Sequence, residues 1–144
     1  MKALSIAPDY AMWILVEDKT IECRTWKTNY RGDILICSTA QKWEGTIPGH
    51  ALCVVELYDV VPFRKEHLEG ACMDEMPSKD SYAWMLRNVR WIKPFPVKGK
   101  LSLWECDHPV EIPGVESWSE KEQDDFANEY IVPLIIPLKK SKDR

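Results

Sequence analysis

Residues 18–32 read DKTIECRTWKTNYRG and lie between an apolar segment and an apolar strand. β-Branched and aromatic residues between 20 and 26 predict an extended strand, in which side chains two apart share a face. We therefore expect one face to carry Thr20, Glu22, Arg24 and Trp26 and the other to carry Ile21, Cys23 and Thr25. The pattern alone fits two interpretations equally well: an exposed strand with a cross-face ion pair, or a functional site.

The size of the chain fits a single folded domain. Its 144 residues have the apolar and charged fractions of an ordinary globular protein. We expect one domain over residues 1–138 and a charged, frayed tail over residues 139–144. The sequence contains no run of about eighteen apolar residues, as a membrane-spanning helix requires. The N-terminal segment does not read as a secretory signal, so we expect a cytoplasmic protein.

The cysteines and histidines do not form a recognisable metal or redox motif. The five cysteines, at 23, 37, 53, 72 and 106, are odd in number and never form a C-x-x-C pair. This pattern predicts reduced thiols, most of them buried. The sequence has no zinc-like spacing, Gly-rich phosphate loop, G-x-S-x-G elbow or H-E-x-x-H motif. We therefore expect neither a metal site nor a cofactor.

The net charge of −4 hides an uneven distribution of charge. Residues 1–100 carry 14 Lys and Arg against 13 Asp and Glu, whereas residues 101–138 carry one against nine. A local basic surface is therefore compatible with the acidic average, and nucleic acid is not excluded as a partner.

The order of the predicted elements decides the fold class. We expect strands at 3–6, 20–26, 34–37, 50–63, 82–94 and 101–106, and helices at 8–16, 64–72 and from a capping box at 119–122 to Pro133. The apolar run at 34–37 predicts a strand covered on both faces, and the long strand at 50–63 predicts a bend or bulge. Pro94 and Pro96 are expected to end the strand before them. This order favours an α+β fold, a mixed, partly closed β-barrel of about six strands with two to three helices at its rim, including a C-terminal helix.

Three charged residues of the opening stretch form the first candidate site. Lys19, Glu22 and Arg24 are spaced so that one acid and two bases converge. A carboxylate between cations has a lowered pKa, and a half-buried lysine beside an arginine has a pKa low enough for a base. Such a cluster suits acyl or phosphoryl chemistry, with Lys19 and Glu22 as catalytic groups, as well as the binding of a phosphate or base edge.

A second candidate segment lies at residues 81–100, which contain five basic residues and no acidic one. Aromatic side chains alternate there with cations: Tyr82, Trp84, Trp91, Arg87, Arg90, Lys93, Lys98 and Lys100. Aromatics that stack on bases beside cations that hold phosphates are typical of proteins that bind single-stranded nucleic acid. The alternative is an amphipathic strand with its tryptophans in the core, which we favour for Trp91 alone.

Several segments together resemble the ASCH domain. They are ALSI at 3–6, YA at 10–11, KTIECRTW at 19–26, YRGDILI at 30–36, YAWMLRNVRWIKPFPVKGK at 82–100 and LWE at 103–105. Lys19, Glu22 and Arg24 match the last three fixed positions of the family pattern G-x-K-x-x-E-x-R, whereas Glu17 stands at the glycine position. The resemblance implies a PUA-like β-barrel with a cleft lined by the strand that carries Lys19, Glu22 and Arg24.

The resemblance also implies a function, and it leaves three hypotheses open. The first is a domain that binds RNA or a modified nucleoside through Lys19, Glu22, Arg24, Trp26, Arg31, Tyr82, Trp84 and Lys98, with Trp84 stacking on a base. The second is an enzyme of the same cleft, an N4-acylcytidine amidohydrolase or a ribonuclease, with Lys19 as base. The amidohydrolase branch has a threonine three residues after the lysine, where this chain has Glu22. The third is a protein-interaction module whose acidic residues 105–125 bind a basic partner.

Overall fold

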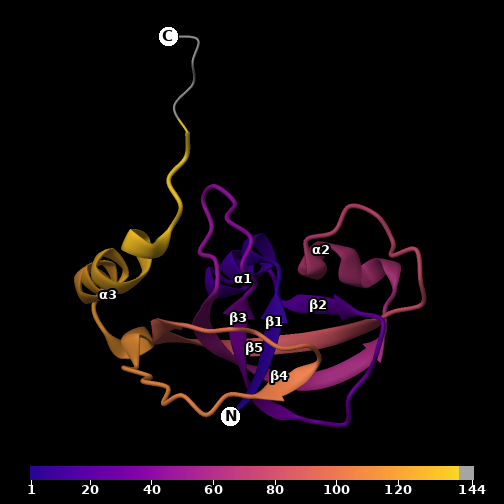
Figure 1. Ribbon diagram of the computed structural model, residues 1–144. Coiled ribbons are helices and arrows are strands. Elements are labelled where there is room, and N and C mark those ends of the chain that lie inside the picture. Colours follow the sequence, from indigo (N-terminus) through magenta and orange to yellow (C-terminus); the bar gives the residue numbers. More distant parts are fainter. Residues whose placement is uncertain (140–144) are drawn as a thin grey trace.

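The computed structural model describes residues 1–139, which build a six-stranded mixed sheet that curls into a half-barrel and carries three α-helices (Figure 1). The strands are β1 (Lys2–Ile6), β2 (Ile21–Arg24), β3 (Gly32–Ser38), β4 (His50–Pro62), β5 (Tyr82–Pro96) and β6 (Leu103–Glu105). The helices are α1 (Pro8–Leu15), α2 (Leu68–Ala71) and α3 (Glu120–Phe126). The predicted fold class is confirmed, and residues 140–144 of the predicted tail lie outside the described residues.

The strand order β2-β5-β4-β3-β1-β6 places β2 at one edge of the sheet and β1 near the other. β1 pairs in parallel with β3, and every other pairing is antiparallel. Parallel strands need a crossover, and here α1 and β2 lie within it. The curl of the sheet brings the two edges back together, since the Arg24 guanidinium on β2 donates to the carbonyl oxygen of Ser5 on β1 at 3.0 Å.

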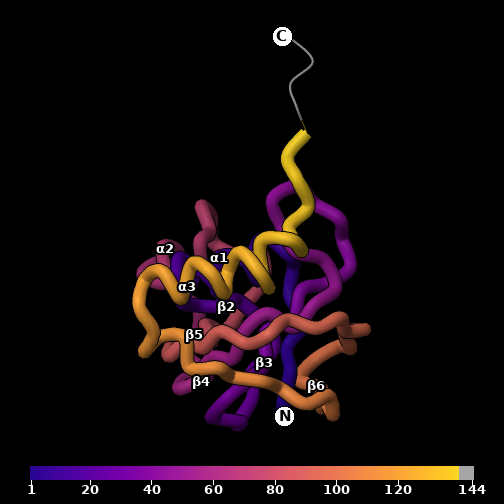
Figure 2. The backbone as a smooth tube through the Cα atoms, turned by 90° about the vertical axis from the view of Figure 1, so that its left-hand side faces the viewer, coloured from indigo at the N-terminus to yellow at the C-terminus, as the bar shows by residue number. Residues whose placement is uncertain are grey.

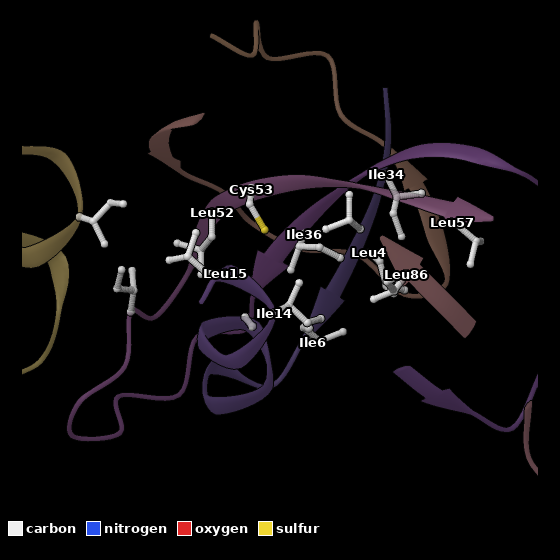
Figure 3. Close-up of a cluster of buried hydrophobic side chains, with 14 of the residues drawn as sticks. Leu4, Ile6, Ile14, Leu15, Ile34, Ile36, Leu52, Cys53, Leu57 and Leu86 are labelled. Carbon is white, nitrogen blue, oxygen red and sulfur yellow. The ribbon is translucent and has the colours of Figure 1, made fainter. Parts of the chain in front are cut away.

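Aliphatic side chains fill the space between α1 and the sheet (Figure 3). Ile14 of α1 belongs there to the same buried cluster as Ile34 and Ile36 of β3. The other face of β3 presents Leu35 and Cys37 to a second buried cluster. The alternation of a strand thus divides one apolar run between two cores. The prediction of a strand covered on both faces is confirmed.

β4 and β5 form the longest pairing of the sheet, and it is irregular. The register shifts between Ala51 and Cys53, between Val54 and Glu56, and between Leu57 and Asp59. These shifts confirm the bend predicted for the strand at 50–63. The predicted end at Pro94 of the strand at 82–94 is wrong, because β5 continues to Pro96. β2 pairs with β5 only at residues 82–85, so none of the described strands pairs with that edge of β5 beside the prolines, where the N–H group that proline lacks is not needed.

α2 covers the start of β2. A 3₁₀ turn at Lys65–His67 leads into the helix, and the Thr20 amide donates to the carbonyl oxygen of Gly70 at 2.8 Å. A Cβ atom at Gly70 would lie 2.8 Å from Ile21 Cδ1, so glycine lets α2 lie this close to β2 without displacing the Ile21 side chain. The carbonyl of Ala71, the last residue of α2, is thereby placed over the chain just before β2.

α3 begins at the predicted capping box. The Ser119 hydroxyl oxygen accepts from the Glu122 amide at 3.2 Å and donates to the Glu122 carboxylate at 2.9 Å. A π-helical turn at Ala127–Ile131 and a 3₁₀ turn at Val132–Leu134 follow α3. Helical structure therefore ends beside Pro133, as predicted.

The segment after α3 returns to the loop at residues 39–49. The Gly45 amide donates to the Ile136 carbonyl oxygen at 2.7 Å, and the Ile136 amide donates to the Thr46 carbonyl oxygen at 2.9 Å. Both views show the yellow C-terminal segment beside this purple loop (Figures 1 and 2). The segment therefore supports a loop that forms one wall of the cleft at Arg24.

The cysteines in the described part of the chain are all free thiols, as the sequence predicts. Cys37 and Cys53 are fully buried, and burial raises the pKa of Cys37 to about 12. These two thiols therefore stay protonated and act as small apolar core residues. No helix among residues 1–139 combines the length and the hydropathy that crossing a membrane demands.

Candidate functional site

Three charged side chains of the opening stretch form a continuous chain of contacts along β2. Lys19 Nζ lies 3.5 Å from Glu22 Oε1, and the other oxygen of Glu22 lies 2.9 Å from Arg24 Nη2. Glu22 and Arg24 share a face of β2 because they are two residues apart, while Ile21 and Cys23 point to the apolar cluster beneath α2. The carboxylate of Glu22 is therefore held between two cations.

Lys19 lies at the enclosed end of this chain of contacts. Its side chain is 1% exposed, its ammonium donates to the Ala71 carbonyl oxygen at 2.6 Å, and it lies 4.3 Å from the centre of the Tyr10 ring. Burial lowers the pKa of Lys19, and the neighbouring Glu22 carboxylate opposes that effect. Carbonyl, carboxylate and aromatic ring surround the ammonium group, so it pins β2 to α2 and α1 and presents no face to a ligand.

Arg24 lies at the open end of the same chain of contacts. Its side chain is 25% exposed, and its guanidinium donates to the Ser5 carbonyl oxygen as well as to Glu22. The Nε atom is buried and has no hydrogen-bond partner among the described residues. Two fixed acceptors on one side orient the guanidinium, and its remaining donors have no acceptor among residues 1–139.

Arg24 lines a cleft of about 490 Å³. β1, the end of β3 and the loop after it form one side of the cleft, and residues 97–102 form the other. The residues that line it are Ser5, Arg24, Ser38, Thr39, Ala40, Gly49, Val97, Lys98, Gly99, Lys100, Leu101 and Ser102. Three of these residues are cationic, and the described lining contains no carboxylate. The cleft is therefore suited to an anionic ligand.

A glycine allows residues 97–102 to lie close to β1. A Cβ atom at Gly99 would clash with the Ser5 hydroxyl oxygen, so only glycine allows the loop this approach. The approach brings Lys98 and Lys100 to the same cleft as Arg24. Ser5 was missed by sequence reasoning, because it reaches the cleft only through the pairing of β1 with β3, for which a serine in a strand gives no signal.

The basic segment at 81–100 is largely neutralised by carboxylates from other parts of the chain. Arg87 pairs with Glu56 at 3.0 Å, Arg90 pairs with Asp33 at 2.6 Å, and Lys93 pairs with Glu111 at 3.1 Å. The hydrogen bonds from Arg90 lower the pKa of Asp33. The local excess of positive charge that the sequence shows therefore survives in the fold at Lys98 and Lys100, which have no ion-pair partner among residues 1–139.

Trp84 does not occupy the position that a stacking role requires. Its side chain is 0% exposed, its indole N–H donates to the Trp26 carbonyl oxygen at 3.2 Å, and the rings of Trp26 and Trp84 meet edge to face at 4.7 Å. Both indoles pack with the main core. The structure leaves the ring of Trp84 no free face for a base, which corrects the stacking role predicted for it.

Arg31 and Tyr82 lie away from the cleft at Arg24. The Arg31 guanidinium donates to the carbonyl oxygens of Thr28 and Tyr30 and lies 3.8 Å from Asp59. Tyr82 is the β5 partner of Arg24 in the sheet, but it lines a different cavity, of about 340 Å³, beside Phe63 and residues 76–81. Of the eight residues predicted to bind, Arg24 and Lys98 line one cleft. Glu22 contacts Arg24 from behind the lining, and Lys19 contacts Glu22.

A family model of the ASCH domain matches residues 4–96. The chain belongs to the ASCH domain family. This match confirms the resemblance, and it runs from within β1 to the end of β5, including Lys19, Glu22 and Arg24.

Solved ASCH structures share the fold of this chain. An ASCH protein from Zymomonas mobilis has 17% sequence identity and a TM-score of 0.56, with 96% of this chain and 97% of that chain covered. A tyrosine-to-phenylalanine mutant of ZmASCH from the same organism has 19% identity and a TM-score of 0.53, with 66% of this chain and 74% of that chain covered. A search of curated proteins finds no match to this chain.

Proposed function

We propose that this ASCH domain binds single-stranded RNA through the cleft at Arg24. The observation that carries the proposal is the composition of that cleft, where Arg24, Lys98 and Lys100 meet serine and threonine residues without a carboxylate in the described lining. Cations and hydroxyl groups are the usual protein partners of phosphate oxygens. The described lining also lacks an aromatic ring, so the cleft is better suited to a phosphate backbone than to a free modified nucleoside.

Arg24 has the central role in this proposal. The Ser5 carbonyl and the Glu22 carboxylate hold its guanidinium in place before any ligand arrives. The side chain is 25% exposed in the cleft, and a phosphate oxygen is an acceptor of matching charge and geometry for a guanidinium. Preorganisation of this kind lowers the entropy lost on binding, because two contacts of Nη2 already restrict the rotamers of the side chain.

Fluorescence anisotropy with a labelled single-stranded RNA tests the proposal. Lys98→Ala combined with Lys100→Ala should weaken binding and lower the slope of log affinity against log salt by about 1.4, since each phosphate contact on a single strand contributes about 0.7. The control is Lys65→Ala combined with Lys79→Ala, which removes the same charge from residues outside the cleft. Equal losses in both double variants, or no RNA binding by the wild type at low salt, would overturn the proposal.

The hydrolytic alternative has less support. Burial lowers the pKa of Lys19 in the direction that a general base requires. However, the amine is enclosed by Ala71, Glu22 and Tyr10, and the described lining of the cleft at Arg24 contains neither a histidine nor a carboxylate. Incubation with N4-acetylcytidine and with RNA, beside a Lys19→Ala control, separates the two hypotheses. Turnover that is lost in a Lys19→Ala protein that remains folded would favour the enzyme.

A further inference from the structure

A second cavity, of about 410 Å³, lies against α3 and uses none of the residues in the RNA proposal. Three aromatic residues, Trp118, Phe126 and Tyr130, form its apolar walls. Trp118 meets Phe126 at 6.0 Å and 77°, and Phe126 meets Tyr130 at 4.8 Å and 43°. Phe126 belongs to the main buried core, so the aromatic walls are fixed in position by packing.

Carboxylates surround these aromatic walls. Glu122, Asp125 and Glu129 line the cavity and recur at spacings of three and four residues. Neighbours at such spacings on a helix are about 5–6 Å apart. The helical segment therefore places a row of acidic groups along the edge of an aromatic groove, in which Asp125 pairs with Lys121 at 3.1 Å and Glu122 accepts from the Ser119 hydroxyl at 2.9 Å.

The cavity already holds one ammonium group from the protein itself. Lys93 reaches in from β5, and its Nζ atom lies 5.2 Å from the centre of the Tyr130 ring. Its charge is anchored by Glu111, at 3.1 Å, which is not one of the three carboxylates that line the cavity. The ring of Tyr130 thus interacts with an ammonium in the way that aromatic cages bind alkylammonium ligands.

We propose that this cavity binds a linear aliphatic polyamine. Its methylene chain would lie on Trp118, Phe126 and Tyr130, and its ammonium groups would meet the row of carboxylates. Polyamines carry ammonium groups three or four methylenes apart, a spacing comparable to that of carboxylates one helical turn apart. A cavity of about 410 Å³ is also of the size that takes a small molecule.

Titration calorimetry with spermidine tests the proposal in the full-length protein. Asp125→Asn and Glu129→Gln should each weaken binding about threefold, the range expected for one ion pair near the surface. The matched controls are Asp124→Asn and Glu120→Gln, which make the same chemical changes on α3 but do not line the cavity. Equal losses in cavity and control variants would indicate attraction of any polycation to an acidic surface and would overturn the proposal.

We expect Lys93→Met to change spermidine affinity in the opposite direction. The variant removes the resident ammonium from Tyr130, so spermidine should bind about threefold more tightly, whereas a structural role for Lys93 predicts weaker binding or none. A lysine-rich peptide supplies the comparison. If the peptide binds and spermidine does not, the face is a protein-docking surface and the polyamine proposal is wrong. RNA binding should be unchanged by Asp125→Asn, so the two proposals succeed or fail separately.

Discussion

The two cations that contact Glu22, Lys19 just before β2 and Arg24 at its end, have opposite environments. Lys19 is 1% exposed and satisfied by groups of its own chain, whereas the side chain of Arg24 is 25% exposed and lines a cleft. Glu22 contacts both cations and is itself almost fully buried. Glu22 of β2 therefore joins a structural cation to a surface cation.

The comparison shows that a charged motif is not a site simply because it is charged. A buried cation costs free energy unless partners repay its desolvation, and here Ala71, Glu22 and Tyr10 act as those partners for Lys19. These contacts of Lys19 join α1, α2 and β2 at one point. Arg24 uses the same carboxylate for orientation and keeps its other donors for a ligand. We therefore expect replacement of Lys19 to reduce stability and replacement of Arg24 to reduce RNA binding.

The largest expected effect is on stability, from Lys19→Met. The variant leaves Glu22 without one of its two cations and leaves the Ala71 carbonyl without its donor. We expect the free energy of unfolding, measured in urea, to fall by about 3 kcal/mol, the range for breaking a buried ion pair by removing one partner. Lys65→Met, at an exposed lysine, is the control. An unchanged unfolding midpoint with lost RNA binding would reverse the roles of the two cations.

Arg24→Lys is expected to damage binding more than stability. The substitution keeps the positive charge but loses the planar donors that contact Ser5 and Glu22 together. RNA affinity should fall about tenfold, which corresponds to about 1.4 kcal/mol. Anisotropy measures the loss, and Arg31→Lys, outside the cleft, is the matched control. A similar loss in both variants would show that general charge, rather than the position of Arg24, determines affinity.

Gly99→Ala is expected to have a smaller effect on the same cleft. The added methyl clashes with the Ser5 hydroxyl and displaces the loop that carries Lys98 and Lys100. RNA affinity should fall about threefold, or well under 1 kcal/mol. Ser5→Ala in the Gly99→Ala background removes the clashing oxygen and should restore part of the loss. No recovery in the double variant would mean that the contact does not position the loop.

The smallest effect is a dependence of stability on pH. Burial lowers the pKa of Lys19 in the folded protein below its ordinary value of 10.5. Between the two pKa values the unfolded chain binds more protons than the folded one, so stability rises with pH in this window. The difference in unfolding free energy between wild type and Lys19→Met should therefore grow as the pH rises toward 10.5. A difference that shrinks over this window would contradict the enclosed position of Lys19.

Much of the fold could be predicted from sequence because local patterns determine it. The capping box at Ser119, the doubly covered strand β3 and the irregular β4 all follow from spacing and polarity within a few residues. The extent of β5 could not be predicted, because the cost of Pro94 and Pro96 depends on a missing neighbour at the strand edge. Which edge is free is a property of the whole sheet.

The candidate site was less predictable for the same reason. The two-residue period correctly places Glu22 and Arg24 on one face of β2. It gives no information on what covers that face, so the enclosure of Lys19 by α2 and the burial of Trp84 were not foreseen. The carboxylates that neutralise the basic segment at 81–100 come from residues distant in sequence. Their pairing is a result of tertiary structure.

The contact between the C-terminal segment and the loop at residues 39–49 has a consequence for hydrogen exchange. The amides of Gly45 and Ile136 are each protected by a carbonyl of the opposite segment, so one opening event exposes both. The deuterium uptake of the two amides should rise together, although they are 91 positions apart in the sequence. A ligand in the adjoining cleft would slow both, which makes this pair of amides a reporter of occupancy remote from the ligand itself.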